Sequence, residues 1–420
     1  MAEQAYSPTR TTDLNGLWRK VQLPLRVALN TMFEEWDALS EFTKFDADWS
    51  TREITAPIDV YDETGIASIE EGDYEAEPTS VGVVDASFSW VMYNGRFTVT
   101  KTAKMIDQRS KSAMLVNQFK FQGKKKIQAI KRRVADDFYG TSSGIKALVS
   151  AVVSGDNTLT QVLELKNGYN QADIQDGGYI ANLFRVKERV AFVRAGALLG
   201  IARITSVTTV AGVARIGLTF AAAVDVNVND AIVFANSMGN TTLAHTDYNK
   251  AMSGWLDCLK ANSLQGIDRT VVENWKIGYA NEAAGRFTNV SYRRLKQAIE
   301  NRGGKLTDLL LDQQVENDMY DQMQAGLRFS DAFNLELDGQ VKARGVKITS
   351  PRRMLPGYAI GYDRKARAKM VLLPDPTEPG WEDGDKIPDK HAFVFSLDYP
   401  CQSVTVNPGA IAYESNKQRQ

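Results

Sequence analysis

The clearest hydrophobic pattern in the chain is one apolar stripe between Ser110 and Phe138. Its members recur every three or four residues, which predicts a single long amphipathic helix. A glycine within the stripe would let a neighbouring element approach closely, and "GTSSG" at 140–144 predicts the end of the helix. The stripe consists of Val116, Phe119, Gly123, Ile127, Ile130, Val134 and Phe138.

Upstream of this helix the pattern changes to alternation in "SFSWVMYNGRFTVTK", residues 87–101. Asn94–Gly95 is the preferred pair for a two-residue type I′ turn, so the segment is predicted to form a β-hairpin. Pairing across that turn would collect the apolar side chains on one face. That face would consist of Phe88, Trp90, Met92, Phe97 and Val99. A lone hairpin is marginally stable in water, so this face needs a surface to pack on.

A third pattern occupies residues 156–238, where short β-branched or alternating segments are separated by Gly, Asn or Asp. The segments "VAFVRA", "GIARITSVTTV", "ARIGLTF" and "AIVFAN" are typical strands, and together they predict a compact all-β module of about barrel size. Helical patterning resumes directly afterwards, which favours an inserted domain.

The rest of the chain mixes both periodicities. Helices are predicted at 15–45, 247–258, 291–302 and 312–327, and "KLTDLLLD" between the last two predicts a short buried strand. Further strands are predicted at 333–350, 358–373 and 391–406. A helix, strand, helix order indicates a small α/β layer, so the predicted fold class is α+β.

Composition narrows the possible functions. The chain has 420 residues, of which 43% are hydrophobic and 24% charged, with a formal net charge of -1, so the protein as a whole is no polyanion binder. Its most apolar region, 191–228, is interrupted by three arginines and is not expected to cross a membrane. Cys258 and Cys401 are far apart and predict buried free thiols.

The charges, however, are strongly segregated. Residues 53–95 contain ten Asp or Glu and no Lys or Arg, whereas 120–133 within the predicted helix contain seven Lys or Arg and no acid. The basic residues are spread around the helix outside its apolar stripe, and a groove-reading helix would concentrate them on one side. A solvated helix and a contact with the acidic stretch of a neighbouring copy both fit this distribution.

No catalytic constellation is recognisable. The two histidines, His245 and His391, have no partner at a catalytic or metal-ligand spacing, and no phosphate loop, nucleophile elbow or zinc motif occurs. We therefore expect no enzyme activity and no cofactor.

The order of these parts resembles the major capsid proteins of tailed bacteriophages with the Hong Kong 97-type fold. The resemblance rests on the basic helix ending in "DDFYGTSSG", on "YRRLKQAIENRGGKLTDLLLDQQVENDMYDQM", and on "LDGQVKARGVKITSPRRMLPGYAIGYDRKA". It covers most of the chain apart from the all-β module. It implies a long spine helix, an extended β-hairpin arm and, in this chain, an inserted small all-β domain.

The resemblance implies a division of the chain into six parts. These are the N-terminal arm at 1–50, the extended loop at 51–105, the spine helix and start of the peripheral domain at 106–155, the inserted domain at 156–238, the axial domain at 239–330, and the peripheral-domain strands with the return to the axial domain at 331–420.

A protein of this family would assemble with itself into the hexamers and pentamers of an icosahedral virion shell, in the host bacterial cytoplasm. It would enclose packaged double-stranded DNA without sequence preference, and scaffolding, portal and decoration proteins are further expected partners. The candidate contacts between copies are Glu70, Glu71, Asp73, Glu75, Glu77, Trp90, Phe97, Lys124, Lys125, Lys126, Lys131, Arg132 and Arg133. The candidates that face DNA are Arg10, Arg19, Lys20 and Arg26.

Two other functions remain open at this point. An encapsulin-like compartment would use the same fold to enclose a protein cargo. A nucleic-acid-binding protein of another class would act through the basic helix at 120–133 and would bind with a steep salt dependence.

Overall fold

The computed structural model describes residues 43–44, 53–61, 82–100, 113–169, 176–236, 242–326, 342–343, 345–351, 353–371, 385–386 and 392–417. These residues belong to two compact units. The first unit contains the described residues within 90–135 and 369–402, and the second contains the others. Each unit is described by itself below.

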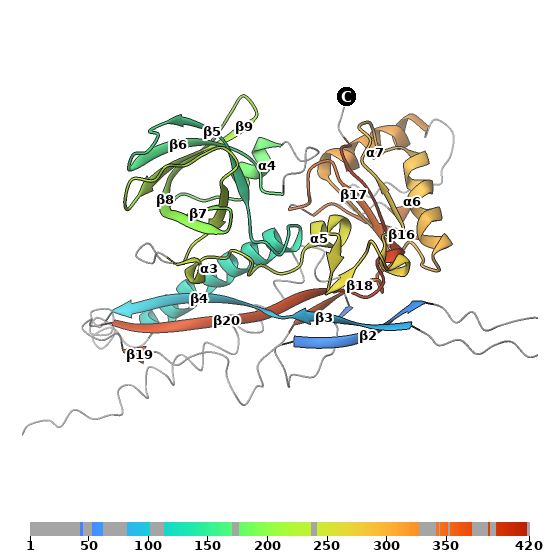
Figure 1. Ribbon diagram of the computed structural model, residues 1–420, viewed down its shortest axis with the longest axis horizontal. Coiled ribbons are helices and arrows are strands. Elements are labelled where there is room, and N and C mark those ends of the chain that lie inside the picture. Colours follow the sequence, from blue (N-terminus) through green and yellow to red (C-terminus); the bar gives the residue numbers. More distant parts are fainter. Residues whose placement is uncertain are drawn as a thin grey trace, which may run out of the picture. The chain divides into compact units, whose positions relative to one another are not determined.

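The first unit combines one long helix with long antiparallel strands. Helix α3 spans Ala113–Phe138, and its last three residues belong to the second unit. Strand β4 (Val91–Thr100) pairs along its whole length with β20 (Ala392–Thr405), and β19 (Asp385–Lys386) pairs with β20 as well (Figure 1). The predicted helix is confirmed, and the buried residues Ile127, Ile130 and Val134 confirm the inner part of its apolar stripe.

The second unit contains a closed barrel. Its strand order is β10-β5-β6-β9-β8-β7, and these strands are drawn in green tones in Figure 1. They span Ala147–Ser154 (β5), Thr160–Asn167 (β6), Arg189–Arg194 (β7), Ala197–Val210 (β8), Val213–Phe220 (β9) and Ala231–Phe234 (β10). The four predicted strand segments are present, but the barrel begins earlier than predicted, because β5 closes it against β10.

Alternation of burial explains why these sequences close into a barrel. Every second residue of β6 from Gln161 onward is buried, as expected for a sheet with one face toward a core. Helix α4 (Gly177–Asn182) adds Ile180 and Ala181 to that core, and the rings of Phe184 and Phe234 meet at a tilted angle with centroids 5.8 Å apart. The barrel is therefore filled by side chains.

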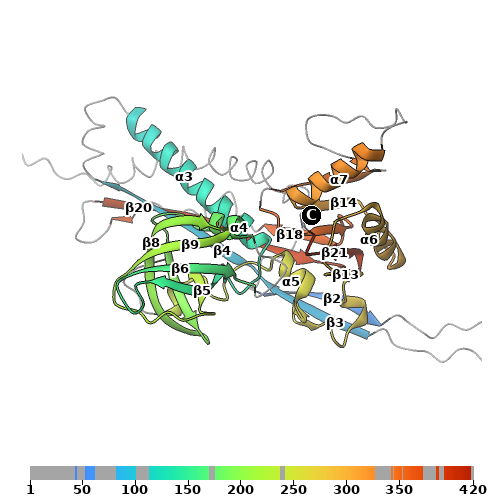
Figure 2. The same cartoon turned by 90° about the horizontal axis from the view of Figure 1, so that it is seen from above.

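The second unit also contains a six-stranded mixed sheet with the order β13-β21-β17-β14-β16-β15. Its strands span Tyr279–Asn281 (β13), Asp308–Leu311 (β14), Lys342–Ala343 (β15), Val346–Thr349 (β16), Ala359–Tyr362 (β17) and Ile411–Glu414 (β21). Helices α6 (Asn289–Asn301) and α7 (Gln313–Gly326) lie beside it (Figure 2). This confirms the two predicted helices and the buried strand between them.

One predicted helix is much shorter than expected. The segment 247–258 was predicted to be helical, but α5 spans only Trp255–Lys260. A side chain at Gly254 would overlap the carbonyl oxygen of Gly140, so this residue is packed against another backbone segment before the helix starts. Trp255 is fully buried, with its ring 6.2 Å from that of Phe138 and 5.3 Å from that of Tyr362.

The remaining elements are short or isolated. Strand β2 (Glu53–Tyr61) pairs with β3 (Gly82–Ser89) in a two-stranded ribbon. The others are β1 (Thr43–Lys44), β11 (Ser263–Leu264), β12 (Ile267–Asp268), β18 (Arg367–Val371) and the 3-10 turns η2 (Leu243–His245), η3 (Glu273–Trp275) and η5 (Pro408–Ala410). Of the helix predicted at 15–45, only 43–44 lie within the described residues, and they form a strand instead.

Candidate functional site

The hairpin predicted at Asn94–Gly95 is wrong. Both residues lie in the middle of β4, where Asn94 pairs with Asp398 and Gly95 with Leu397 of β20. The Asn94 side chain also donates a hydrogen bond to the Asp398 carboxylate. Pairing with a strand whose facing residue lies 304 positions further along the chain therefore replaces the predicted local turn.

Gly95 has a different reason to be glycine. It is buried, and a Cβ atom there would lie 3.1 Å from Cδ1 of Ile130 on α3. That distance is tighter than ordinary van der Waals contact, so the missing side chain lets β4 approach the helix. Gly95 thus serves close packing of β4 against α3 in the first unit, and not a turn.

The continuous strand also changes which side chains share a face. Tyr93, Gly95 and Phe97 alternate inward and are buried, and Phe97 stacks on Phe395 with a ring distance of 5.5 Å. Met92 lies on the opposite face and is 47% exposed. The prediction that Met92 and Phe97 share one apolar face is therefore wrong. Phe97 is a core residue of its own chain, and a role in a contact between copies would require that core to open.

The basic residues of α3 are not equally accessible. Lys125 is exposed, whereas Lys126, Arg132 and Arg133 are half-buried. Lys131 is only 6% exposed, because it follows Ile127 by one helical turn and lies beside the apolar stripe. Lys131 therefore belongs neither to a solvated face of the helix nor to a surface that a neighbouring copy could reach.

Several other candidates lie outside the described residues or have no described side chain. Trp90 lies just before β4 and is half-buried. The carboxylates Glu70, Glu71, Asp73, Glu75 and Glu77, the basic residues Arg10, Arg19, Lys20 and Arg26, and the side chain of Lys124 lie outside the described part.

Part of the acidic stretch is nevertheless described as the ribbon β2–β3. Ser87 of β3 donates its backbone N–H to the carbonyl of Gln265 at 2.8 Å. Ala86 is buried in an apolar cluster with Leu264, Ile267, Val272 and Trp275. The predicted hairpin was expected to need a surface to pack on. In the structure it is the ribbon β2–β3 that packs on such a surface, through its strand β3.

The end of α3 is held by buried ion pairs. Asp137 pairs with Lys146 just before β5, and the side chains of both residues are 2% exposed. Arg353 lies 3.2 Å from the carboxylate of Asp136 and donates to the carbonyl of Asn182 at 3.0 Å. These contacts connect the helix end, the barrel and the loop before β17 within the second unit, and no local sequence pattern indicated them.

Burial raises the pKa values of two tyrosines in the second unit. Burial, together with the neighbouring Tyr179 and the carboxylates of Asp137 and Asp136, raises the pKa of Tyr169 well above its ordinary value. Burial and Asp136 likewise raise the pKa of Tyr179. Both phenols therefore stay protonated at neutral pH and can act as hydrogen-bond donors there.

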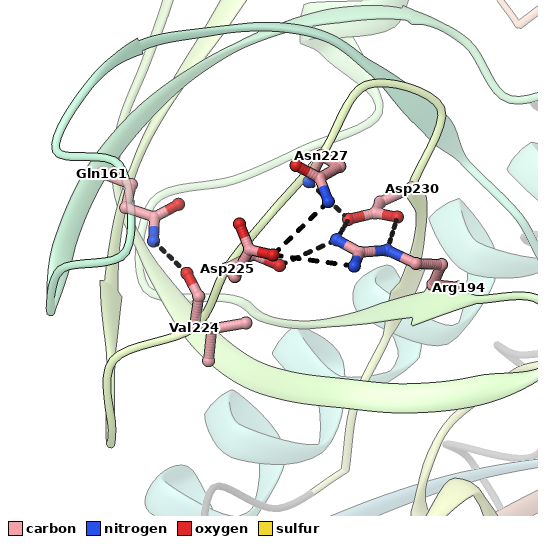
Figure 3. A network of polar contacts seen from close by, with 6 residues as sticks. All are labelled: Gln161, Arg194, Val224, Asp225, Asn227 and Asp230. Carbon is pink, nitrogen blue, oxygen red and sulfur yellow. Dashed lines mark hydrogen bonds and ion pairs between the residues drawn. The ribbon is translucent and has the colours of Figure 1, made fainter.

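Figure 3 shows a polar network that fixes the turn before β10. Arg194 donates from Nε and Nη2 to the two carboxylate oxygens of Asp230 at 2.8 and 2.9 Å, and from Nη2 to the carbonyl of Asp225 at 2.8 Å. The backbone N–H of Asn227 donates to Asp230 at 2.7 Å. The hydrogen bond to Asp230 raises the pKa of Arg194. Arg194 thus offsets part of the negative charge that Asp225 and Asp230 place at this turn.

Among the described residues no group of three or more His, Cys, Asp or Glu could hold a metal ion. Cys258 and Cys401 are buried free thiols, as predicted. His245 lies in η2, and His391 lies outside the described residues. Within the described part, no helix has both the length and the apolar character needed to cross a membrane.

Comparison with known proteins gives structural matches alone. No family model matches the sequence, and no curated protein matches it. Among solved structures, the capsid asymmetric unit of cyanophage A-1(L) is 12% identical, with 91% of this chain and 93% of that chain covered and a TM-score of 0.49.

The capsid of an empty GTA particle is 10% identical, with 91% of this chain and 90% of that chain covered and a TM-score of 0.48. The chain is similar to capsid proteins. It is also similar to the holo-SrpI encapsulin of Synechococcus elongatus PCC 7942, at 9% identity, with 80% of this chain and 78% of that chain covered and a TM-score of 0.38. At these identities and TM-scores, the likeness does not by itself assign a function.

Proposed function

We propose that this chain is the major capsid protein of a tailed double-stranded DNA bacteriophage. It would assemble into the hexamers and pentamers of an icosahedral shell with the Hong Kong 97-type fold. The observation that carries the proposal is the order of elements along the chain. An antiparallel ribbon precedes a helix of 26 residues, a barrel and a mixed sheet with two helices follow, and a 14-residue strand returns near the end.

This order supports the assignment because it agrees with what the sequence resemblance implies. In this proposal α3 is the spine helix, and the ribbon β2–β3 belongs to the extended loop. The barrel is the inserted domain, with its start moved to Ala147, and the sheet with α6 and α7 belongs to the axial domain. The role is structural, with no cofactor.

Copies would meet through opposite charges. The acidic stretch of one copy would approach basic residues of a neighbour, among them Lys124, Lys125, Lys126, Arg132 and Arg133 on α3. Exposed ion pairs contribute about 0–1 kcal/mol each, so they would set register and encounter rate more than affinity. Lys131 and Phe97 are no longer favoured, because their own chain buries them.

The N-terminal residues Arg10, Arg19, Lys20 and Arg26 would contact packaged DNA without sequence preference. Scaffolding, portal and decoration proteins are further proposed partners. The shell would form in the host bacterial cytoplasm and remain in the virion.

Electron microscopy of the purified protein tests this proposal directly. The expected result is closed particles with fivefold and sixfold clusters of subunits. A protein that stays monomeric under all assembly conditions would overturn it.

A charge-reversed variant tests the contact between copies. Replacing Lys124, Lys125 and Lys126 with Glu should lower particle yield and leave the monomer folded, as its circular dichroism spectrum would show. The matched control is Arg293→Glu with Arg294→Glu, two exposed arginines on α6. Equal particle yields for both variants would contradict a role for the helix.

Particle contents separate the two shell functions. Nuclease-protected double-stranded DNA inside particles from infected cells supports the capsid, whereas a defined protein cargo supports an encapsulin-like compartment. The nucleic-acid-binding alternative predicts tight DNA binding by the soluble monomer, with an affinity that falls steeply as salt rises.

A further inference from the structure

The barrel surface carries four exposed basic residues in two neighbouring segments of its sheet: Arg185, Lys187, Arg189 and Arg203. We call them the basic cluster. The Lys187 N–H donates to the carbonyl of Ile204 at 2.8 Å, and the Ile204 N–H donates to the carbonyl of Glu188 at 2.9 Å. The two segments are therefore adjacent in the backbone ladder.

Within this cluster Arg189 of β7 lies directly opposite Arg203 of β8. Directly opposed residues of an antiparallel pair point to the same face, with Cβ atoms about 4.5–5.5 Å apart. Like charges in that position destabilise a sheet. The barrel therefore retains a repulsive pair on its surface that an anion would relieve.

The other arginines of the barrel strands have carboxylate partners. Arg215 lies opposite Glu164 in the β6–β9 pair and donates to it at 2.6 Å. Arg194 binds Asp230 through two nitrogen atoms. In the described part of the chain, no ion pair connects the basic cluster to a carboxylate. Like-charge opposition at Arg189 and Arg203 is thus an exception among the arginines of the barrel strands.

The neutral and acidic groups at the cluster do not remove its positive charge. Arg189 donates from Nη1 to the backbone carbonyl of Asn236 at 2.9 Å, which is a neutral acceptor. The carboxylate of Glu188 accepts the backbone N–H of Arg185 at 2.8 Å. Four cations and this single carboxylate leave a formal excess of three positive charges on this surface.

The anionic counterpart is present in the same sequence. The chain has a formal net charge of -1, while residues 53–95 hold ten acids and no base. The remainder of the chain therefore carries nine positive charges in formal excess. Within that stretch, residues 62–77 alone contain seven acids.

We propose that the basic cluster is a docking site for the acidic segment 62–77 of a second copy of this chain. The proposal rests on the proposed function, since it requires copies to assemble. It adds the barrel to α3 as an acceptor of the acidic stretch. Charge complementarity favours the barrel, because its four cations are exposed while Lys131 of α3 is buried. Such a contact would mainly set register and encounter rate.

Peptide binding tests the site on the full-length protein. The probe is a fluorescent synthetic peptide of residues 62–77, and its control carries amides in place of all seven acids. Arg189→Glu with Arg203→Glu should weaken binding of the acidic peptide about tenfold, as two exposed charge reversals would. The matched control, Arg293→Glu with Arg294→Glu on α6, should bind like the unmodified protein.

A single substitution separates binding from folding. Arg203→Glu places opposite charges across the β7–β8 pair and keeps the hydrogen bond from Arg189 to the carbonyl of Asn236, so the barrel should unfold at the same or a higher temperature while peptide binding weakens. Unchanged peptide binding in both cluster variants would overturn the proposal. Stronger binding of a 20-base-pair DNA duplex than of the peptide, lost in the same variants, would assign the cluster to nucleic acid instead.

Cross-linking in assembled particles tests the second copy. A carbodiimide joins an amine directly to a carboxylate, so particles made from mixed light and heavy-isotope chains should yield Lys187 linked to 62–77 of the other isotope. Lys305, an exposed lysine next to the mixed sheet, is the control. Links within one chain alone, or none at Lys187, would overturn the proposal. Failure of the unmodified protein to form particles would instead refute the proposed function, whatever the peptide does.

Discussion

Asn94–Gly95 lies within a strand, whereas Ala211–Gly212 forms a turn, although the sequence of the first pair favours a turn more strongly. Asn94–Gly95 has the stronger turn signal, yet it lies inside the ten residues of β4. Ala211–Gly212 has the weaker signal, yet it forms a two-residue turn with φ of 49° and 79° between β8 and β9, where Val210 pairs with Val213. Neither Asn94 nor Gly95 has a positive φ.

The difference shows that the partners of a segment can outweigh its turn propensity. The β4 ladder pairs ten residues with β20, and each hydrogen bond contributes about 0.5–1.5 kcal/mol net. A two-residue turn preference acts on two residues alone, so it cannot compete with a ladder of ten. At Ala211–Gly212 the situation differs, because β8 and β9 on either side of the pair bond to each other up to Val210 and Val213.

The largest effect is expected at Gly177 of α4, which packs against the β8–β9 turn. A side chain at Gly177 of α4 would overlap the carbonyl oxygen of Gly212, and neither backbone segment can yield easily. Gly177→Ala should therefore lower the unfolding free energy of the barrel by about 3 kcal/mol. Thermal unfolding and amide exchange of β8–β9 measure this. Gly196→Ala is the control for backbone strain without overlap, since its φ is +80° and no atom lies within 4 Å of its Cβ position, whereas Gly177 has no positive φ. An equal loss in both variants would show that packing at α4 does not support the turn.

The next largest effect is expected at Gly95, where space is limiting. Gly95→Val should destabilise the first unit by about 1–3 kcal/mol, because the added atoms meet Ile130. Exchange of the β4 amides reports the change. In a protein that already carries Ile130→Ala, space for the new side chain exists, so Gly95→Val should destabilise the first unit less than it does in the unmodified protein. If Gly95→Val has no effect, the close approach to α3 is not the reason for glycine.

A smaller effect at Gly212 should depend on conformation and not on size. Nothing lies within 4 Å of its Cβ position, but its φ is +79°. Gly212→Ala should cost about 1–2 kcal/mol, and Gly212→Asn less, because Asn tolerates the left-handed region. At Gly95 the larger Asn should cost more than Ala. If Ala and Asn rank the same way in stability cost at Gly212 and at Gly95, conformation and space do not limit the two sites differently.

The smallest effect is a gain of stability at Ala211. Ala211→Asn creates the preferred pair at a residue whose φ is already 49°. It should stabilise the β8–β9 turn by roughly 0.5 kcal/mol, since Asn accepts positive φ more readily than Ala. Barrel unfolding in denaturant measures the gain. A loss of stability would mean that another contact fixes Ala211.

The candidate site could be predicted only in part. The basic residues of α3 and the acidic stretch were visible as charge runs, and the helix followed from its apolar period. The burial of Lys131, the bond from Asn94 to Asp398 and the position of Arg353 near Asp136 were not predictable, because they join segments far apart in the chain. The opposition of Arg189 and Arg203 likewise requires the register of β7 against β8.

The sequence by itself determined the strongly periodic elements: α3, α6, α7, the buried strand β14 and most barrel strands. Their hydrophobic spacing repeats over enough residues to favour one type of secondary structure without help from distant parts of the chain. Only the tertiary structure decided what Asn94–Gly95 does, which face Phe97 joins and which charges remain exposed. Those outcomes depend on β20, α3 and the barrel register, and a residue cannot encode locally a partner that folding brings to it from elsewhere in the chain.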